Sequence, residues 1–451
     1  MHHNLATLAI FLAASAWLLS TSHAADRPNI IFILADDLGY GDLAHTGAPD
    51  VETPHLDALA ARGITFTSFY NNGPECTPTR TALLTGRYQQ RAGGLECAIG
   101  TGDVGRYDDA EALAATGQLG LPPEMAVLPR ALKDAGYATG IFGKWHLGYR
   151  DHFNPLNYGF DQFFGVLGGN CEYYTHKELS PIPVVYENRE PVEREGYMTH
   201  LITDHALMFL KQQHGSDSPF FLYLPYTTPH FPFQPPGDRS TYTAENWTAG
   251  TRENYVAMVE DLDTQVGRII SYLADNGFKG DTVVAFASDH GAMKPGRNLP
   301  YRDFKGTLFE GGIRAPLTVF VPDSELVAKK AHFPALTFDL THTFLNLAGV
   351  ENTADLGLDG IDLIPHVRKD TAPQRPLFWR SKRGDRTWRA ARVGDLKYIS
   401  KTEAGQTTQH LFDLATDPHE THDLLDEKPG ETSRLKAALK TWESLVAAPR
   451  P

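Results

Sequence analysis

The segment Cys76-Thr77-Pro78-Thr79-Arg80 holds one of only three cysteines in the chain and is the first candidate for chemistry. Pro78 suits the first turn of a helix and Gly86 can end a short one, so we expect the cysteine near a helix N-terminus. The unpaired backbone N–H groups of such a terminus favour an anion, which indicates a negatively charged substrate. The alternative is a structural cysteine that pairs with Cys97 or Cys171 in an oxidising compartment.

Three aspartates are candidates for binding a cation. Asp36 and Asp37 directly follow one apolar run, while Asp289 follows another and precedes His290. Three carboxylates in one cleft need a positive charge between them, and hard oxygen ligands favour Ca²⁺ or Mg²⁺. Asp36-Asp37 alone could equally cap the turn after a strand. The second acidic strand end favours the metal site.

Basic residues occupy similar positions along the chain. Lys144 and His146 follow a predicted strand, and His230 follows another after a short turn. Each of them alone is more often a solvated lysine or an internally bonded histidine. Their shared position at strand ends favours a functional role.

Four apolar runs, 30–35, 138–142, 220–224 and 282–287, predict the strands that position these residues. Helical patterns at 54–62, 128–135 and 255–273 lie between them. This alternation predicts an α/β fold with a mostly parallel sheet sandwiched by helices. Because ligands bind at the carboxyl ends of such strands, we expect the polar residues to converge there.

The last part of the chain has a different pattern. Short strands at 376–379, 388–393, 396–400 and 410–414, then a helix at 433–447, predict a small antiparallel sheet with one helix. We therefore divide the chain into a main domain, 25–354, and a C-terminal subdomain, 355–451. Two stretches without clear periodicity, 96–123 and 165–197, are expected to form walls or lids of the site.

The N-terminal sequence predicts where the protein is located. Leu5 to Leu19 is apolar and is followed by Ser22-His23-Ala24, which indicates a signal peptide at 1–24 rather than a stable membrane span. A retained N-terminal anchor is the alternative. We expect a periplasmic or secreted protein. The net charge of −14 argues against nucleic acid or anionic lipid as a partner.

Several motifs together resemble the type I, formylglycine-dependent sulfatases of the alkaline-phosphatase-like superfamily. The cysteine motif is followed by Leu84-Thr85-Gly86-Arg87, and Gly143 to Gly148 and Lys305 to Arg314 are close to family patterns. Leu358 to Ile361 and Asp413 to Pro418 extend the resemblance into the C-terminal part. The motifs occur in family order across nearly all of the mature chain.

The resemblance implies a sulfuric ester hydrolase in which Cys76 is oxidised to formylglycine (3-oxoalanine). A formylglycine-generating or anaerobic sulfatase-maturating enzyme would make that change. The resemblance also implies a calcium ion, with Mg²⁺ as the alternative, bound by Asp36, Asp37, Asp289, His290 and the modified Cys76. Many members have Asn where this chain has His290.

The remaining roles follow from the charges of the reaction. Lys144 and Lys305 would neutralise the sulfuryl oxygens, and Arg80 would orient the hydrated formylglycine. His230, with Lys305 able to share the role, would protonate the leaving alcohol. His146 would deprotonate the second hydroxyl, so that sulfate leaves by C–O cleavage.

Long walls favour a sulfated carbohydrate over a small aryl ester as the substrate. The candidates for reading its sugar groups are Asn170, His176 and Arg314, with Glu172, Arg302 and a stacking Trp379 as further possibilities. Two other functions stay open. One is a phosphomonoester or phosphonate hydrolase on the same fold, and the other is a non-catalytic protein that binds sulfated glycans with Cys76 unmodified.

Overall fold

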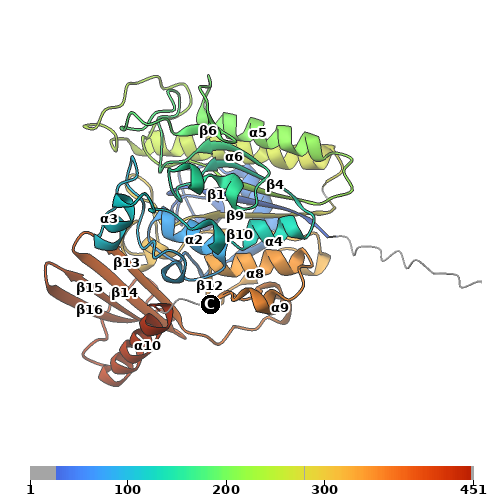
Figure 1. Cartoon of the computed structure of the whole chain (residues 1–451). Coiled ribbons are helices and arrows are strands. Elements are labelled where there is room, and N and C mark those ends of the chain that lie inside the picture. Colours follow the sequence, from blue (N-terminus) through green and yellow to red (C-terminus); the bar gives the residue numbers. More distant parts are fainter. Residues whose placement is uncertain (1–26, 279, 448–451) are drawn as a thin grey trace, which may run out of the picture.

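The computed structural model describes residues 27–278 and 280–447, so the predicted signal peptide at 1–24 lies outside the described residues. A ten-stranded sheet forms its centre, in the order β11-β2-β10-β9-β1-β8-β4-β5-β6-β7 (Figure 1). The five neighbours β9, β1, β8, β4 and β5 run parallel, while β10 and β6 join antiparallel. The expected mostly parallel sheet is confirmed.

The strands of the described chain fall into three sheets. Those of the central sheet are β1 Asn29–Ala35, β2 Ile64–Phe66, β4 Ala138–Lys144, β5 Gln162–Val166, β6 Val185–Glu187, β7 Glu190–Pro191, β8 Phe220–Pro225, β9 Thr282–Ser288, β10 Leu317–Phe320 and β11 Lys330–Ala331. A two-stranded sheet contains β3 Phe69–Tyr70 and β12 Ala335–Leu336. The third sheet contains β13 Leu377–Arg383, β14 Arg386–Val393, β15 Leu396–Glu403 and β16 Gln406–Asp413.

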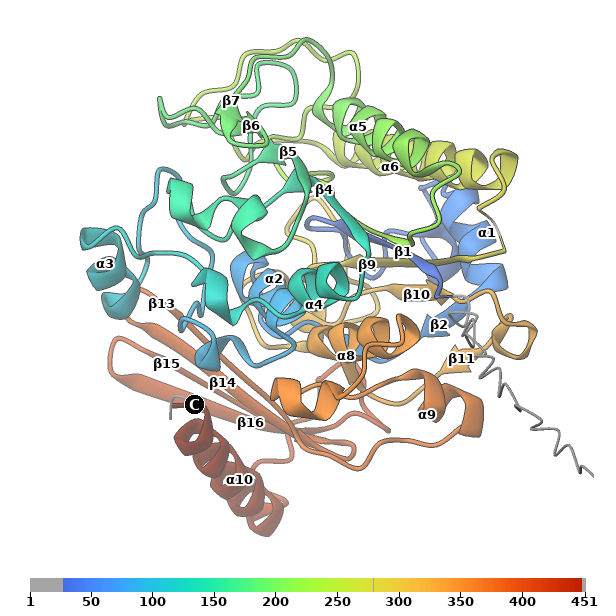
Figure 2. The same ribbon diagram turned by 45° about the vertical axis from the view of Figure 1, so that its right-hand side comes forward.

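Helices cover both faces of the central sheet (Figure 2). Their bounds are α1 Pro54–Arg62, α2 Cys76–Thr85, α3 Asp108–Ala115, α4 Leu128–Asp134, α5 Met198–Gln213, α6 Arg252–Asp275, α7 Glu310–Ile313, α8 Thr337–Leu347, α9 Ile364–Lys369 and α10 Pro429–Ala447. None of these helices is long and apolar enough to cross a membrane, as far as the described residues extend.

Strand β1 shows how the sequence builds two cores. Ile30, Phe32 and Leu34 point to the face covered by α2, α4 and α8, while Ile31 and Ile33 point to the face covered by α1, α5 and α6. Successive side chains of a strand alternate between faces, so a strand buried on both sides needs an unbroken apolar run. The run ends at Ala35, where the polar residues of the site begin.

The C-terminal sheet is antiparallel and packs against α10, as the sequence predicts. Buried polar contacts join it to the main domain. Lys397 Nζ donates to Glu310 Oε1 at 2.7 Å and to Glu420 Oε1 at 3.0 Å. Trp379 is fully buried, and its indole N–H donates to the Asn71 carbonyl at 2.8 Å. The boundary at residue 355 stays a prediction.

The two aperiodic stretches contain short elements that the pattern does not reveal. Helix α3 lies inside 96–123, and β6 and β7 lie inside 165–197. Only Ala110 of α3 is buried, so the helix has no apolar stripe to detect. Strands of two or three residues are likewise too short to show an alternation.

The three cysteines are free and buried. The structure therefore excludes a disulfide between Cys76 and either of the others. Cys97 and Cys171 are not paired with each other either.

Candidate active site

The site lies at the carboxyl ends of four neighbouring parallel strands. Asp36 follows β1, Lys144 ends β4, His230 follows β8 after a short turn, and Asp289 follows β9. These strands are adjacent in the order β9-β1-β8-β4, so residues more than 250 positions apart in the chain come together. The expected convergence at one sheet edge is therefore observed.

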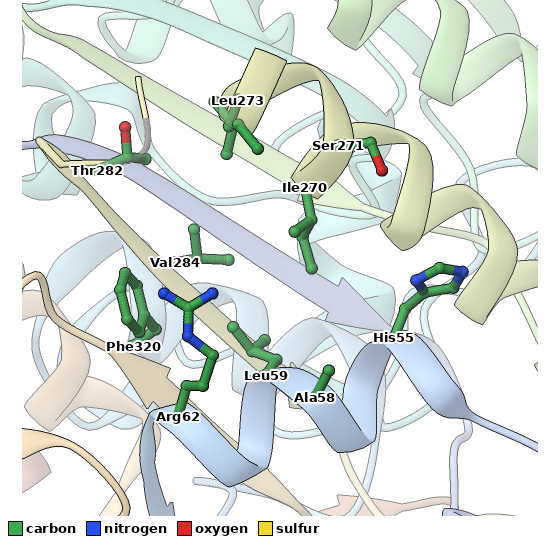
Figure 3. A pocket seen from close by; sticks show the side chains of 11 residues that line it. His55, Ala58, Leu59, Arg62, Ile270, Ser271, Leu273, Thr282, Val284 and Phe320 are labelled. Carbon is green, nitrogen blue, oxygen red and sulfur yellow. The ribbon is translucent and has the colours of Figure 1, made fainter. Parts of the chain in front are cut away.

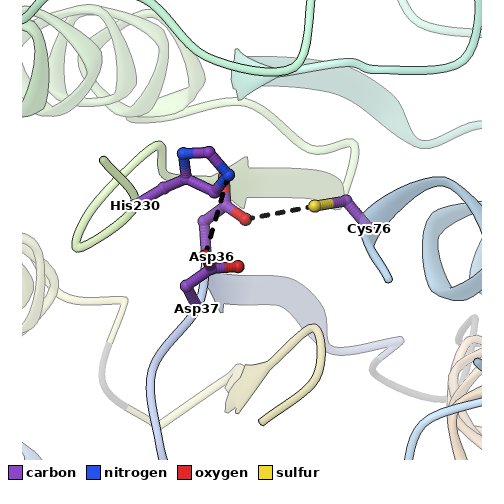
Figure 4. Close-up of side chains that lie close together, drawn as sticks. All are labelled: Asp36, Asp37, Cys76 and His230. Atoms are coloured by element: carbon purple, nitrogen blue, oxygen red, sulfur yellow. Dashed lines mark hydrogen bonds and ion pairs between the residues drawn. The ribbon is translucent and has the colours of Figure 1, made fainter. Parts of the chain in front are cut away.

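Cys76 is the first residue of α2 and is 1% exposed. Its helix ends at Gly86, which adopts the left-handed conformation at φ 66°, as predicted. The thiol Sγ lies 3.2 Å from Lys144 Nζ, 3.2 Å from His290 Nε2 and 3.5 Å from Asp36 Oδ1. Figure 4 shows the thiol directed at the Asp36 carboxylate, with Asp37 and His230 beside it.

A cluster of hard ligands surrounds the thiol. One ligand atom from each of Asp36, Cys76, Asp289 and His290 lies within 4.8 Å of the others, and a second group joins Asp37 and His230 to Asp36 and Cys76. The His290 Nδ1–H donates to the Gly291 carbonyl at 3.0 Å, so Nε2 is the ring nitrogen that faces the cluster. Buried carboxylates with one imidazole suit a hard divalent cation, so the residues present fit such an ion.

A cationic side chain partners each aspartate. Lys144 Nζ donates to Asp36 Oδ2 at 2.6 Å, Lys305 Nζ to Asp37 Oδ1 at 2.7 Å, and Arg80 to Asp289 Oδ2 at 3.0 Å. Burial raises the pKa of the Cys76 thiol, but Lys144 and Lys305 outweigh it and lower that pKa to about 7. The thiol position is therefore one where negative charge is stabilised.

Arg80 contacts residues of the predicted metal site. Its guanidinium also donates to the Lys144 carbonyl at 2.8 Å, and it is 1% exposed. It thereby fixes both the Asp289 carboxylate and the end of β4. Its predicted role in orienting an oxidised Cys76 stays a prediction.

One ring nitrogen of His146 has no partner among the described residues. Its Nε2–H donates to the Ile99 carbonyl at 2.8 Å, while its buried Nδ1 has no hydrogen-bond partner among the described residues. Burial, together with Lys144, holds the pKa of His146 well below its usual range. A neutral imidazole with a free Nδ1 lone pair is the form that accepts a proton.

These groups open into one cavity of about 350 Å³. Cys76, His146, His230 and Lys305 line its floor, and Asn170 lines it as predicted. Both aperiodic stretches contribute to the walls, since Ile99 and Thr101 come from the first and Asn170 from the second. The predicted wall function of these stretches is consistent with that position.

The structure gives other partners to His176 and Arg314. His176 Nε2 contacts the Gly196 carbonyl at 3.1 Å, and Arg314 forms a buried ion pair with Glu310 at 2.9 Å. Neither belongs to the described residues that line the cavity. Arg314 continues the Lys305 motif, but it directly follows α7 and its guanidinium bonds to Glu310, Thr67 and Ser68.

The weaker candidates also have internal partners. The Arg302 guanidinium donates to the Glu420 carbonyl at 2.7 Å, and a carboxylate oxygen of Glu172 accepts from the Tyr242 amide at 3.2 Å. Trp379 is 0% exposed, so stacking on a sugar is wrong for this residue.

Sequence reasoning missed three arginines of the cavity wall, Arg106, Arg383 and Arg386. The last two lie at the turn between β13 and β14, in the C-terminal subdomain. Only the packing of that sheet against the main domain brings them to the site. The one available signal was their flanking of the turn residues Gly384-Asp385.

A second pocket, of about 200 Å³, lies between α1, α6 and the start of β9 (Figure 3). Leu59, Ile270, Val284 and Phe320 make it apolar. Val284 lies toward the start of β9, whereas Asp289 follows the end of that strand. The pocket does not share the chemistry of the strand ends.

Comparison with known proteins identifies the family of the chain. A family model described as Sulfatase matches residues 28–350. The chain is 37% identical over 391 residues to the N-acetylgalactosamine-6-sulfatase of Mus musculus, covering 82% of this chain and 72% of that protein. It is 32% identical over 473 residues to the arylsulfatase A of Bos taurus, covering 94% and 88%.

A solved structure is also similar over most of its length. The crystal structure of Ps i-CgsB in complex with k-i-k-neocarrahexaose matches with a TM-score of 0.80 and 28% identity, covering 92% of each chain. The chain belongs to the sulfatase family, in the alkaline-phosphatase-like fold. Its class of activity is the hydrolysis of sulfuric esters.

Proposed function

We propose that this sulfatase hydrolyses sulfate esters of carbohydrates with a formylglycine made from Cys76 and a bound calcium ion, Mg²⁺ being the alternative. The observation that carries the proposal is the position of the Cys76 thiol. It lies within 3.8 Å of two lysines, one aspartate and one histidine, all of them buried except the partly exposed Lys305. The sulfur atom stands where the oxygen atoms of an oxidised side chain would lie.

Asp36, Asp37, Asp289 and His290 would hold the ion, with the oxidised Cys76 as a further ligand. The ion supplies positive charge that acidifies a neighbouring hydroxyl and offsets the charge of the sulfuryl group. The ligand-atom cluster and the Nδ1 hydrogen bond of His290 support this assignment. An imidazole in place of an amide is compatible with it, because Nε2 faces the other ligand atoms.

The hydrated form of an oxidised Cys76 would offer one hydroxyl for attack on sulfur and a second for release of sulfate. Lys144 and Lys305 are placed to neutralise the sulfuryl oxygens, since both ammonium groups lie beside Sγ. His146 can accept the proton of the second hydroxyl on its free Nδ1. The deprotonated oxygen would then form a C=O bond while the C–O bond to sulfate breaks, so no second attack on sulfur is needed.

The departing alcohol oxygen needs a proton. His230 and Lys305 line the same cavity, and each reaches Asp37: His230 Nε2 at 3.7 Å and Lys305 Nζ at 2.7 Å. We assign the two residues jointly to that proton transfer. Their shared contact with one carboxylate supports a common position at the leaving-group side.

The relatives support a carbohydrate as substrate. The mouse relative is named for N-acetylgalactosamine 6-sulfate, and the Ps i-CgsB structure contains an oligosaccharide. The cavity beside Cys76 is lined by charged and polar side chains as well as apolar ones, and it has room for more than the sulfate group. A maturating enzyme as partner and a periplasmic or secreted address remain predictions from the cysteine motif and residues 1–24.

Cys76→Ala tests the proposal. We expect this variant to fold but to release no sulfate, and the wild-type peptide containing residue 76 to be lighter than its cysteine form by roughly 18 Da. Paired sulfate and phosphate esters of one alcohol would separate a sulfatase from a phosphomonoesterase. Substantial sulfate release by Cys76→Ala, or an unmodified thiol in fully active enzyme, would reject the nucleophile.

A further inference from the structure

Three arginines form a second positive region in the cavity that contains Cys76. Arg106 follows the short bridge between Gly100 and Val104, while Arg383 and Arg386 flank the β13–β14 turn. The two segments are joined directly, because the Gly384 N–H donates to the Arg106 carbonyl at 2.6 Å. The C-terminal sheet therefore contributes a fixed wall to the active site.

The nearby carboxylates do not pair closely with all three arginines. Arg383 pairs with the buried Glu75 at 2.7 Å, but Arg386 reaches only the half-exposed Glu403 at 3.9 Å. Arg386 Nε is buried and has no hydrogen-bond partner in the described part of the chain. Arg106 has no ion-pair partner there either. The guanidinium groups of Arg106 and Arg386 thus line the cavity and have N–H donors that no carboxylate uses closely.

The scissile sulfate does not account for these arginines. Lys144 and Lys305 already surround the Cys76 thiol, and each holds its own aspartate. Arg383 is tied to Glu75, the residue directly before Cys76, so the wall lies next to the reacting group. A guanidinium fork matches the paired oxygens of a carboxylate or a sulfate, and Arg106 and Arg386 have no close carboxylate of their own among the described residues.

We propose that Arg106, Arg383 and Arg386 form a second anion subsite, which binds another negatively charged group of the carbohydrate beside the ester that is cleaved. The inference rests on the proposed function, since it takes the reacting sulfate to lie at Cys76. The substrate class is then a carbohydrate with at least two anionic groups. The second group is a uronate carboxylate or a second sulfate ester, which share the chemistry that a guanidinium recognises.

Arg386→Ala and Arg106→Ala are the test variants, because neither removes the partner of a buried carboxylate. Arg389→Ala is the matched control. It lies three residues from Arg386 on β14, hence on the other face of the sheet, and pairs with Glu443 of α10. Its loss leaves Glu443 in contact with Arg380.

Three substrates share one sulfated hexosamine, joined to a neutral hexose, to a hexuronate or to a second sulfated sugar. With the full-length enzyme we expect each test variant to lower kcat/KM for an anionic partner sugar at least about tenfold, the scale of one charged hydrogen bond. The neutral disaccharide should change within about twofold, as should all three with Arg389→Ala. The anionic disaccharide whose kcat/KM falls more identifies the second group as a carboxylate or a sulfate.

Equal losses on all three substrates, or none, would overturn the subsite. If the wild type released sulfate from none of them, the proposed function would fail instead. The subsite would then be tested by binding of the anionic disaccharides to the Cys76→Ala protein, measured by calorimetry. Binding there must weaken about tenfold with Arg386→Ala, and unchanged binding would reject the inference.

Discussion

Replacing Lys144 by Met removes one cation from the reacting centre while keeping the length of the side chain. Lys144 is 0% exposed and lies 3.2 Å from the Cys76 thiol and 2.6 Å from Asp36. A unit charge at 3.2 Å is worth about 5 kcal/mol at an effective dielectric constant of 20, an upper bound because Asp36 already uses part of it. We therefore expect a loss of about 3 kcal/mol in the transition state, or about a hundredfold in kcat.

The assay is sulfate release from a saturating aryl sulfate, with the mass of the Cys76 peptide measured to show equal oxidation. Lys133→Met is the control, since Lys133 is a half-exposed lysine that pairs with Asp161 on the surface. Such pairs contribute at most about 1 kcal/mol, and this one is not part of the cavity. A loss below about threefold in folded, oxidised Lys144→Met would remove Lys144 from the reaction.

Three further predictions concern stability. Removing the metal with a chelator should lower both activity and Tm. Calcium at a concentration of a hundred times its Kd should restore about 2.7 kcal/mol of unfolding free energy. A Tm that changes with neither chelator nor calcium would contradict the metal site. Lys397→Met leaves the buried Glu310 and Glu420 without their shared cation, so urea unfolding should show a loss of about 3–5 kcal/mol in unfolding free energy. The control Lys401→Met, at a partly exposed lysine, should change it little. Burial raises the pKa of Glu178 from 4.5 to about 7, so the folded state keeps a proton that the unfolded chain loses, and stability should fall by up to roughly 3 kcal/mol between pH 4.5 and 7. Glu178→Gln should flatten that slope, and an unchanged pH profile would reject the assignment.

The sheet could be predicted because its central strands are long and apolar throughout. The β1 and β9 runs are buried along nearly their whole length. An unbroken apolar run of seven residues is typical of a strand that is covered on both faces. The antiparallel additions at the edges could not be predicted. β10 has four residues and β2 has three, so their pairing depends on neighbours that are distant in sequence.

Most of the floor was predictable for the same reason, since His146 and His230 come after recognisable strands and Cys76 opens its helix. Lys305 follows no strand and was predicted mainly from its motif. The wall was not predictable. Arg383 and Arg386 end and begin strands whose pattern indicates only an antiparallel hairpin. Their position over Cys76 depends on how one sheet packs against another domain, which no local pattern encodes. Arg314 shows the opposite error, because its motif belongs to the family but its side chain is buried beside Glu310.

The charges of the site explain how an acidic protein can accept an anionic substrate. Three buried aspartates face Arg80, Lys144 and Lys305, so the floor is balanced before any ion binds. A divalent cation in the aspartate cluster would therefore add its charge as an excess, next to the side chain that must take up a sulfate ester. The lysines alone could not provide that excess, because each is already paired at 2.7 Å or less. Removing one aspartate should thus do more than weaken binding of the ion. It also leaves one basic side chain without its carboxylate, and the remaining ligands are too few to compete with water for the ion.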